Sequence, residues 1–335
     1  MIDASKLDTS MFRGTARLIL QDALLRNWKV AVLKEGSSHF YIDRGDGKHL
    51  HIQSSIIPSL SFIAGSTANN KFMTSQLLSE AGIKQLDSIV TRVIDHVAIR
   101  SFLESNKTIV VKPLDGAHGN GVRTNLQTVS EVSFAIEYAQ QYTKSGAVIL
   151  QEQFPSQEIW DIRLLCMDQK YSAAIHRVPA RVFGDGILSV LELIKKENES
   201  PDRGMPYMKK LAFIDIERAL KYLGESAESI PKPGEEVRVI DVANYGAGGE
   251  IHDITDDIPD WMKHQAELAA RTLDLPVAGV DYLVSAKPEC NMKENEMTTC
   301  IIEVNKGPSL AIHDEPHSGK NRHTVSMLLD MIASL

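Results

Sequence analysis

The stretch that decides the fold is residues 109–122, which read IVVKPLDGAHGNGV. Thr108–Lys112 is rich in β-branched residues, so it predicts a strand that ends on Lys112. A loop with glycines at positions 116, 119 and 121 follows directly. Glycines let backbone N–H groups approach a phosphate closely, and a lysine supplies a point charge. The stretch therefore indicates a phosphate-binding loop, although a glycine-rich hairpin between strands would have the same composition.

Two other phosphate-binding motifs do not fit this stretch. The sequence contains no GxxxxGK[ST] pattern, which excludes a P-loop. Thr124 stands where a dinucleotide-binding fingerprint would have a glycine. The loop therefore belongs to neither of these nucleotide-binding classes.

Three polar side chains lie in or beside apolar strands near the end of the chain. Asp281 lies in the predicted strand Val277–Val284, and Glu303 lies in Cys300–Val304, with Asn305 just beyond it. Strand alternation places Glu303 and Asn305 on one face, where Asp281 could meet them from a neighbouring strand. Such oxygen ligands suit Mg²⁺, and charges in apolar strands are costly unless paired or metal-bound. The pattern predicts a magnesium site, with solvent-facing strand ends as the alternative.

Three arginines are candidates for binding an anion. Arg163 and Arg177 lie in predicted strands, and Arg203 lies in a polar loop. Guanidinium groups suit bidentate binding of carboxylate or phosphate. The alternative for each is an arginine that is simply solvated.

Composition narrows the class of protein. The chain has 335 residues, of which 43% are hydrophobic, enough for two or three subdomains. A net charge of −8 gives no overall basic field for nucleic acid or an anionic membrane. The three cysteines form no CxxC pair, so they indicate neither a disulfide framework nor a zinc site. Residues 1–14 lack a signal-peptide core, and no apolar run is long enough for a membrane span, so we expect a cytoplasmic protein.

The order of helices and strands predicts an α+β or α/β fold. Helical spacing of apolar residues predicts helices at 14–27, 71–81, 132–142, 188–195, 261–273 and around 325–332. Strand patterns occur at 28–33, 39–42, 49–53, 108–112, 148–154, 162–167, 172–178, 237–243, 277–284 and 300–304. The polar stretch 197–205 is expected to be a loop.

Taken together and in order, these segments resemble the ATP-grasp fold, and most of all the ATP-grasp module of cyanophycin synthetase and the bifunctional glutathione synthetases. The similarity runs from about residue 15 to residue 332. The motifs occur in the family's order: Lys71 before a helix, VVKPLDGAHGNGV at 110–122, DIR at 161–163, RVPARVFGDG at 177–186, NxxPxRG at 198–204, GVD at 279–281 and EVNKGP at 303–308. The resemblance implies an α+β protein in which two α/β subdomains grip ATP, with a small N-terminal α/β domain at 1–68, a lid subdomain at 69–155 and a large subdomain at 156–335.

The resemblance also implies roles for individual residues toward ATP and metal. Lys71 and Lys112 would contact the ATP phosphates, and the loop with Gly116, His118, Gly119 and Gly121 would cover them. Glu152 and Phe154 would hold adenine, and Asp161 or Glu158 would reach the ribose. Asp281, Glu303 and Asn305 would hold two Mg²⁺ ions, with Mn²⁺ as an alternative.

The remaining implied roles concern the acyl substrate. Arg163, Arg177 and Arg203 would bind phosphate or the acyl substrate, and Asn244 would lie near an acyl-phosphate. The chain departs from the family pattern at Asn70, at Lys84-Gln85-Leu86, at Ile240 where an arginine is expected, and at Gly246 where a serine is expected. The last two lie where the acyl group would sit, so they leave the substrate open.

The implied function is an ADP-forming carboxylate–amine ligase that joins an amino acid or small peptide carboxylate to an amine. One alternative is a glutathione-synthetase-like step on a γ-glutamyl dipeptide. Another is a nucleotide-binding homologue that has lost ligation, which the departures at Ile240 and Gly246 suggest. The expected partners are small-molecule substrates, and the resemblance favours a homodimer or homotetramer.

Overall fold

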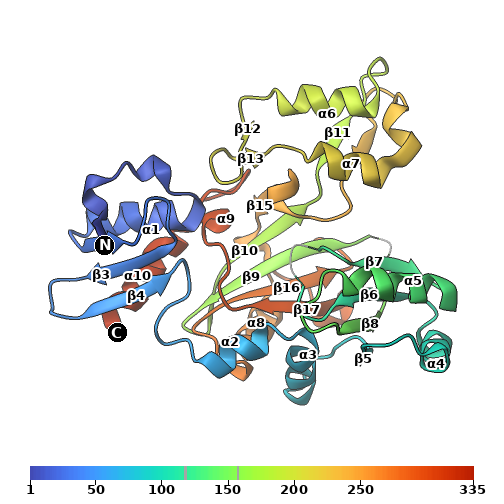
Figure 1. The fold of residues 1–335 in the computed structure, drawn as a ribbon, viewed down its shortest axis with the longest axis horizontal. Coiled ribbons are helices and arrows are strands. Elements are labelled where there is room, and N and C mark those ends of the chain that lie inside the picture. Colours follow the sequence, from blue (N-terminus) through green and yellow to red (C-terminus); the bar gives the residue numbers. More distant parts are fainter. Residues whose placement is uncertain (117–118, 157) are drawn as a thin grey trace.

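An antiparallel sheet of five strands lies at the centre of the molecule (Figure 1). The computed structural model describes residues 1–116, 119–156 and 158–335. The strand order is β15 (Glu250–Asp253), β10 (Lys170–Val178), β9 (Trp160–Met167), β16 (Val277–Val284) and β17 (Thr299–Asn305). Because every neighbouring pair in this sheet is antiparallel, the fold is of the α+β class that the sequence predicted.

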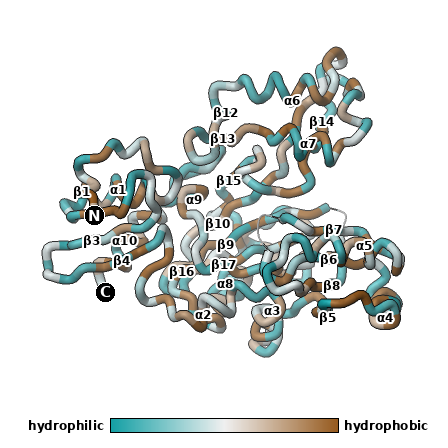
Figure 2. Tube along the Cα trace, in the orientation of Figure 1, coloured by the Kyte–Doolittle hydropathy of each residue, from teal (hydrophilic) through white to brown (hydrophobic). Residues whose placement is uncertain are grey.

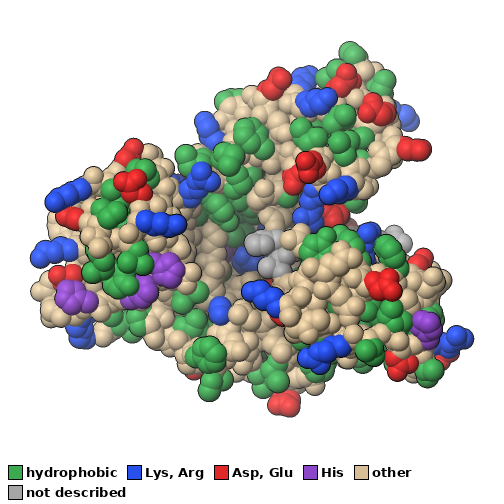
Figure 3. All heavy atoms as spheres, viewed as in Figure 1, with side chains coloured by type: hydrophobic (Ala, Val, Ile, Leu, Met, Phe, Trp, Pro, Cys, Tyr) green, Lys and Arg blue, Asp and Glu red, His purple; other side chains and the backbone are tan. Residues whose placement is uncertain are grey.

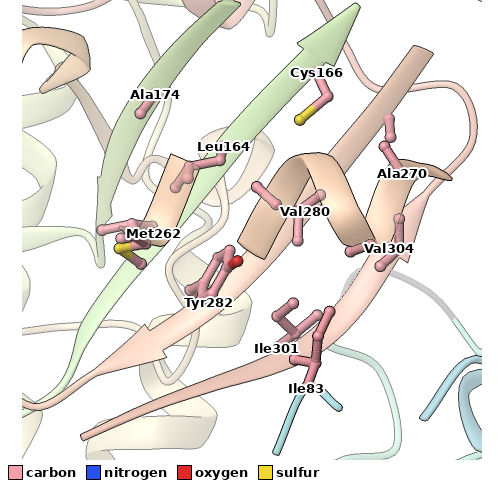
Figure 4. Close-up of a cluster of buried hydrophobic side chains, with 14 of the residues drawn as sticks. Ile83, Leu164, Cys166, Ala174, Met262, Ala270, Val280, Tyr282, Ile301 and Val304 are labelled. Atoms are coloured by element: carbon pink, nitrogen blue, oxygen red, sulfur yellow. The ribbon is translucent and has the colours of Figure 1, made fainter. Parts of the chain in front are cut away.

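One face of the central sheet packs against helices. Side chains alternate between the two faces of a strand, and Leu164, Val280 and Tyr282 all point to this side. They meet Met262 of helix α8 (Asp260–Thr272) and Ile83, which follows helix α3 (Lys71–Glu80), in one apolar cluster (Figure 4). The helices that supply the cover are α2 (Phe62–Ala68), α3 (Lys71–Glu80) and α8 (Asp260–Thr272).

The opposite face of the central sheet is divided into an apolar part and a charged part. Leu165 and Met167 of β9, with Val277 of β16, pack into the core of the N-terminal domain. Arg163 and Asp281 lie on the same face. Arg163 is two residues from Leu165 on β9, and Asp281 is four residues from Val277 on β16. The division places a group of charged side chains directly beside a packed core.

The N-terminal domain combines both ends of the described chain. Its antiparallel sheet has the order β1 (Ile2–Asp3), β2 (Lys29–Val32), β3 (His39–Asp43) and β4 (His49–Gln53). The helices α1 (Gly14–Leu25) and α10 (Thr324–Ser334) cover it. Phe40 and Ile42 of the sheet pack with Leu20 of α1 and Leu328 of α10, all fully buried.

A second antiparallel sheet lies beside β17 and forms a separate lobe, here called the lid. Its order is β5 (Ser88–Thr91), β8 (Val148–Glu152), β6 (Ile109–Pro113) and β7 (Arg123–Leu126). The helices α4 (His96–Asn106) and α5 (Val129–Gln140) cover one face of it. In Figure 2 the strands of the lid carry both hydrophobic and hydrophilic residues, as expected for a sheet with one face buried.

A third lobe, here called the upper lobe, is inserted between β10 and β15. It contains α6 (Val190–Asn198), α7 (Ile216–Leu223) and two small sheets, β11 (Arg181–Phe183) with β14 (Glu236–Arg238) and β12 (Arg203–Gly204) with β13 (Leu211–Ala212). Its own core includes Val182, Ile194 and Ile240. The short helix α9 (Ala311–Asp314) follows β17 and leads toward α10.

The expected helices and strands are mostly present, with small shifts at their ends. The lid helix predicted at 132–142 begins at Val129, because Thr128 and Glu131 form a capping box there. The strand predicted at 237–243 ends at Arg238, after which the chain is irregular. No sequence pattern predicted four helices, α2, α4, α7 and α9, or seven short strands, β1, β5, β7, β11, β12, β13 and β15; of these, β12 lies in the stretch 197–205 that was expected to be a loop. No helix among the described residues is long and apolar enough to cross a membrane.

The packing of α10 gives a direct test of the N-terminal domain. Replacing fully buried Leu328 with alanine should lower the free energy of unfolding by about 2–5 kcal/mol, because it removes apolar contact and leaves a cavity. Its neighbour Met327 is 39% exposed, so Met327→Ala should change that free energy by less than about 0.5 kcal/mol. Urea unfolding monitored by circular dichroism measures both variants. Equal losses would mean that α10 does not face the sheet as described.

Candidate active site

A pocket lies between the lid sheet and the central sheet. It is lined by Lys71 of α3, Lys112 of β6, Gln151 of β8 and Glu303 of β17. These residues come from both lobes and are up to 232 positions apart in the sequence. Figure 3 shows this side of the molecule hollowed between the lobes, with Lys and Arg side chains in the hollow. The fold thus brings together the two lysines and one of the carboxylates that the sequence singled out.

Lys112 lies at the end of β6, inside this pocket. Its ammonium group donates a hydrogen bond of 2.8 Å to Oε1 of Gln151. Burial lowers the pKa of Lys112 to about 8, and the positive charge of Lys71 adds to the shift. A half-buried lysine whose only described hydrogen-bond partner is neutral suits an incoming anion.

Lys71 joins the lid to the central sheet. Its Nζ lies 3.1 Å from Oε1 of Glu303 and donates a 2.8 Å hydrogen bond to the carbonyl oxygen of Gly116. Asn70 accepts a hydrogen bond from the backbone N–H of Met73 and so begins α3, as an N-cap residue does. Asn70, one of the departures from the family pattern, therefore acts as a helix N-cap here.

Asp281 is the centre of a buried charged cluster on the divided face. Arg163 stands directly opposite it on β9, and Glu303 stands opposite it on β17. Arg163 donates two hydrogen bonds to the Asp281 carboxylate, at 2.5 and 2.7 Å, and Arg177 donates a third at 3.2 Å. Burial alone would raise the pKa of Asp281, but the two guanidinium groups outweigh it and hold the pKa below its usual range.

Asp161 belongs to the same cluster. It accepts hydrogen bonds from Arg177, whose side chain therefore bridges Asp161 and Asp281. Burial raises the pKa of Asp161 in spite of this partner.

The glycine-rich loop leaves the pocket and reaches toward the upper lobe. Gly119 and Gly121 have φ angles of +74° and +76°, which favour glycine. A Cβ atom on Gly119 would lie 2.9 Å from a methyl carbon of Val242 in the upper lobe. Asp115 holds the start of the loop, because its carboxylate accepts hydrogen bonds from the backbone N–H groups of residues 144 and 145. His118, which the resemblance placed against the phosphates, lies outside the described residues.

The oxygen donors of the predicted magnesium site lie on one face of β16 and β17. The amide of Asn305 lies 3.3 Å from Oδ2 of Asp281, and Asp281 is directly opposite Glu303. Exchanging the oxygen and nitrogen of the Asn305 amide by rotation would direct its oxygen, in place of its nitrogen, toward the Asp281 carboxylate. Two carboxylates and an amide oxygen beside a lysine-lined pocket form a donor set that fits Mg²⁺ together with a phosphate.

Two predicted site residues have structural contacts instead. The Arg203 side chain is buried, pairs with Glu197 at 2.9 Å, and donates to the carbonyl oxygens of Ala212 and Gly248. Asn244 caps a short turn by accepting a 2.8 Å hydrogen bond from the backbone N–H of Gly246. In this structure neither Arg203 nor Asn244 belongs to the cluster of Arg163 and Arg177. The contacts of Arg203 and Asn244 favour a role in shaping the loop at 244–249 over direct binding of an anion.

The residues expected near adenine and ribose lie at the end of β8 and beyond it. Glu152 pairs with Asp87 through the backbone, and Phe154 is buried. Glu158 accepts a hydrogen bond of 3.1 Å from the indole N–H of Trp160. Their roles toward a nucleotide stay predictions.

Two residues near the site were missed by the sequence analysis. Gln151 is the hydrogen-bond partner of Lys112, and only the pairing of β6 with β8 could have found it. Arg218 of α7 pairs with Asp241 at 2.7 Å and has a nitrogen 3.8 Å from the position that a Cβ on Gly119 would occupy. No motif in the sequence marks Arg218.

Comparison with known proteins agrees with this geometry. The family model described as prokaryotic glutathione synthetase, ATP-grasp domain, matches residues 80–187. The glutathione biosynthesis bifunctional protein of Listeria innocua is 30% identical over 95% of this chain and 41% of its own length. Cyanophycin synthetase of a Nostoc species is 29% identical over 88% of this chain and 32% of its own length.

A solved structure supports the same fold. The bifunctional glutathione synthetase from Pasteurella multocida matches 98% of this chain and 45% of its own, with a TM-score of 0.69 and 23% identity. The chain therefore has the ATP-grasp fold, and its residues 80–187 match an ATP-grasp domain model. It is similar to cyanophycin synthetase and to the bifunctional glutathione synthetases, and it spans about a third to two fifths of the length of these curated relatives.

The charged cluster predicts different responses to substitution of its two carboxylates. Asp281→Asn removes the charge that neutralises two buried guanidinium groups, so it should lower the free energy of unfolding by about 3–5 kcal/mol. Glu303→Gln is the matched control, because Glu303 is more exposed and has one lysine partner; it should cost about 1 kcal/mol or less. Urea unfolding of both variants measures the difference. Similar stabilities for the two would contradict the pairing described for Asp281.

Proposed function

We propose that this chain is an ATP-dependent carboxylate–amine ligase that forms an amide or peptide bond through an acyl-phosphate and releases ADP and phosphate. The observation that carries the proposal is the meeting of Lys71, Lys112 and Glu303 in one pocket between two sheets of an ATP-grasp fold. A phosphate-binding loop adjoins that pocket, and a second carboxylate, Asp281, stands opposite Glu303.

ATP would enter the pocket between the lid and the central sheet. Its phosphates would lie against Lys112 and Lys71, and the glycine-rich loop would cover them with backbone N–H groups. Adenine would lie toward the end of β8, at Glu152 and Phe154, and Asp161 or Glu158 would reach the ribose. Asp161 accepts a hydrogen bond from Arg177, and Glu158 accepts one from Trp160, so both stay candidates for the ribose.

In the first step, an oxygen of the substrate carboxylate attacks the γ-phosphorus of ATP, and the bond from that phosphorus to the β–γ bridging oxygen breaks. The products are an acyl-phosphate and ADP. Lys71 and Lys112 supply positive charge where the phosphoryl group moves. Bound at Asp281, Glu303 and Asn305, one or two Mg²⁺ ions would neutralise phosphate charge, and Mn²⁺ could replace them.

In the second step, the nitrogen of an amine attacks the acyl carbon. The resulting tetrahedral intermediate loses phosphate, the nitrogen releases a proton, and the amide remains. Closure of the glycine-rich loop against Val242 would keep water from the acyl-phosphate. Arg163 and Arg177 would position the Asp281 carboxylate, because their guanidinium groups are already paired with it.

The substrates proposed are an amino acid or small peptide as the acid and an amino acid or amine as the acceptor. A γ-glutamyl dipeptide is a second candidate for the acid, since a relative carries glutathione synthesis in its name. The division at 1–68, 69–155 and 156–335 and a homodimer or homotetramer are part of the same proposal. Light scattering after size exclusion measures the oligomeric state.

A nucleotide-binding protein without ligase activity is the rival function. It is favoured by Ile240, which is fully buried in the upper-lobe core and supplies no cation to the acyl group. Gly246 likewise offers no hydroxyl in the turn that Asn244 caps. Ligation and simple ATP binding therefore need an experiment that tells them apart.

Transfer of a labelled oxygen separates these functions. If the acid substrate carries heavy oxygen in its carboxylate, one labelled oxygen should appear in the inorganic phosphate when an amine is present. The acids to screen are amino acids and small peptides, including a γ-glutamyl dipeptide, with mass spectrometry of the phosphate and the product. Glu303→Gln is the control and should show no transfer, because an oxygen ligand of the phosphate-bound metal is lost.

Other results would refute the mechanism. An ATPase would give phosphate whose new oxygen comes from water. An adenylate-forming enzyme would give label in AMP and would release pyrophosphate. Absence of any substrate-dependent phosphate after a broad screen would favour the nucleotide-binding protein.

The lowered pKa of Lys112 predicts a pH dependence of ATP binding. Phosphate binds the ammonium form, so the affinity for Mg²⁺–ATP should weaken as the pH rises above about 8, by up to about tenfold per unit. Lys112→Arg keeps the charge and should flatten this decline, whereas Lys107→Arg, at an exposed site, should leave it unchanged. Isothermal titration at several pH values measures the affinities. A decline that persists unaltered in Lys112→Arg would remove Lys112 from the phosphate site.

A further inference from the structure

A group of metal-binding side chains lies at the edge of the central sheet farthest from the proposed ATP pocket. Glu250 and His252 are on β15, the edge strand opposite β17, and His317 lies in the segment between α9 and α10. One ligand atom from each of these three residues can be chosen so that all lie within 4.8 Å of one another. None of the three belongs to the ATP-grasp motifs described above.

The distances between these atoms are close to those of ligands on one ion. Nε2 of His252 is 2.9 Å from Oε2 of Glu250, and Nδ1 of His317 is 3.8 Å from the same oxygen. Two ligands about 2.1 Å from a tetrahedral zinc ion lie about 3.4 Å apart. Small side-chain rotations would therefore equalise the two distances around a common ion.

His317 has an unused ring nitrogen at this point. Its Nδ1 is shielded from solvent and has no hydrogen-bond partner among the described residues. The distance of 3.8 Å to Glu250 is too long for a hydrogen bond. The backbone N–H of His317 donates to the carbonyl oxygen of Ile251 at 2.8 Å, which holds the imidazole beside β15. A buried nitrogen without a partner costs free energy that a bound ion would recover.

The other two residues are oriented by contacts behind them. Nδ1 of His252 lies 2.6 Å from Oγ of Ser318, so its Nε2 is the nitrogen directed at Glu250. Arg181 donates two hydrogen bonds to the Glu250 carboxylate, at 3.2 and 3.0 Å. Such outer contacts fix the rings and carboxylates of metal sites, although a guanidinium also competes with the ion for the carboxylate.

We propose that Glu250, His252 and His317 bind one divalent transition-metal ion of the Zn²⁺ type, with water completing the coordination. Two imidazoles and one carboxylate suit Zn²⁺ and Co²⁺, whereas Mg²⁺ prefers oxygen ligands only. The ion joins β15 to the segment that connects α9 with α10. Its role is structural, because it links the edge of the central sheet to the chain that leads into the N-terminal domain.

The test uses the whole chain, stripped with chelator and kept in excess Mg²⁺. One other pair of imidazoles needs to be removed first: His39 and His51 lie 3.2 Å apart on the exposed face of β3 and β4, where histidines gather in Figure 3. In a His51→Gln background, titration with Co²⁺ or Zn²⁺ should reveal one equivalent of tight binding. Co²⁺ should add a visible absorption band typical of low coordination number, and Zn²⁺ should raise the melting temperature.

Matched variants assign the site. His317→Gln should weaken Zn²⁺ binding by about tenfold or more and abolish the thermal shift. Its melting temperature in chelator should equal that of the parent, since the ring nitrogen lost there makes no bond. His317→Cys, which restores a zinc ligand, should recover binding, and His264→Gln, in α8, should change nothing. No stoichiometric binding in the His51→Gln protein, or unchanged binding in His317→Gln, would overturn the proposal.

Discussion

The ion pair between Arg163 and Asp281 is the constraint around which the central sheet is arranged. The two residues stand opposite each other on adjacent strands, and almost none of the Asp281 side chain is exposed. Removing two charges from water is expensive, and a buried pair seldom stabilises a fold more than apolar side chains would. The pair therefore needs every partner it has, from Arg177 and Asn305 as well. That need explains why one end of an otherwise apolar sheet face is left polar, and why the proposed chemistry lies there.

Strand periodicity correctly predicted how the three proposed metal ligands are arranged, and its limits explain what was missed. Glu303 and Asn305 do share a face, as alternation requires, and Asp281 meets them from the neighbouring strand. Alternation says nothing about which strands are neighbours, so the pairing of Lys112 with Gln151 stayed hidden. Most of the long amphipathic helices were found, whereas α7, α2 and the short edge strands are too brief for a periodic signal.

Arginines show a second limit of sequence reasoning. Arg163, Arg177 and Arg203 looked alike in the sequence, since each follows a strand or loop pattern that could face an anion. The structure separates them by burial: the first two are paired with carboxylates beside the pocket, and the third holds carbonyl oxygens inside the upper lobe. A guanidinium has several donors, so its role depends on which acceptors the tertiary fold places around it. Those acceptors, at Ala212 and Gly248, lie 9 and 45 positions away along the chain.

The shared core of α1 and α10 has a consequence for how the chain folds during its synthesis. Arg26, just after α1, bonds to Asp330 of α10, 304 residues later. The sheet formed by β1 to β4 therefore lacks one of its two covering helices until α10 has been translated. Until then its apolar side chains, among them Phe40 and Ile42, stay partly uncovered. The lid and central sheet, which lie between β4 and α10 in the sequence, can mature in the meantime, so a domain whose sheet is made before them is completed after them.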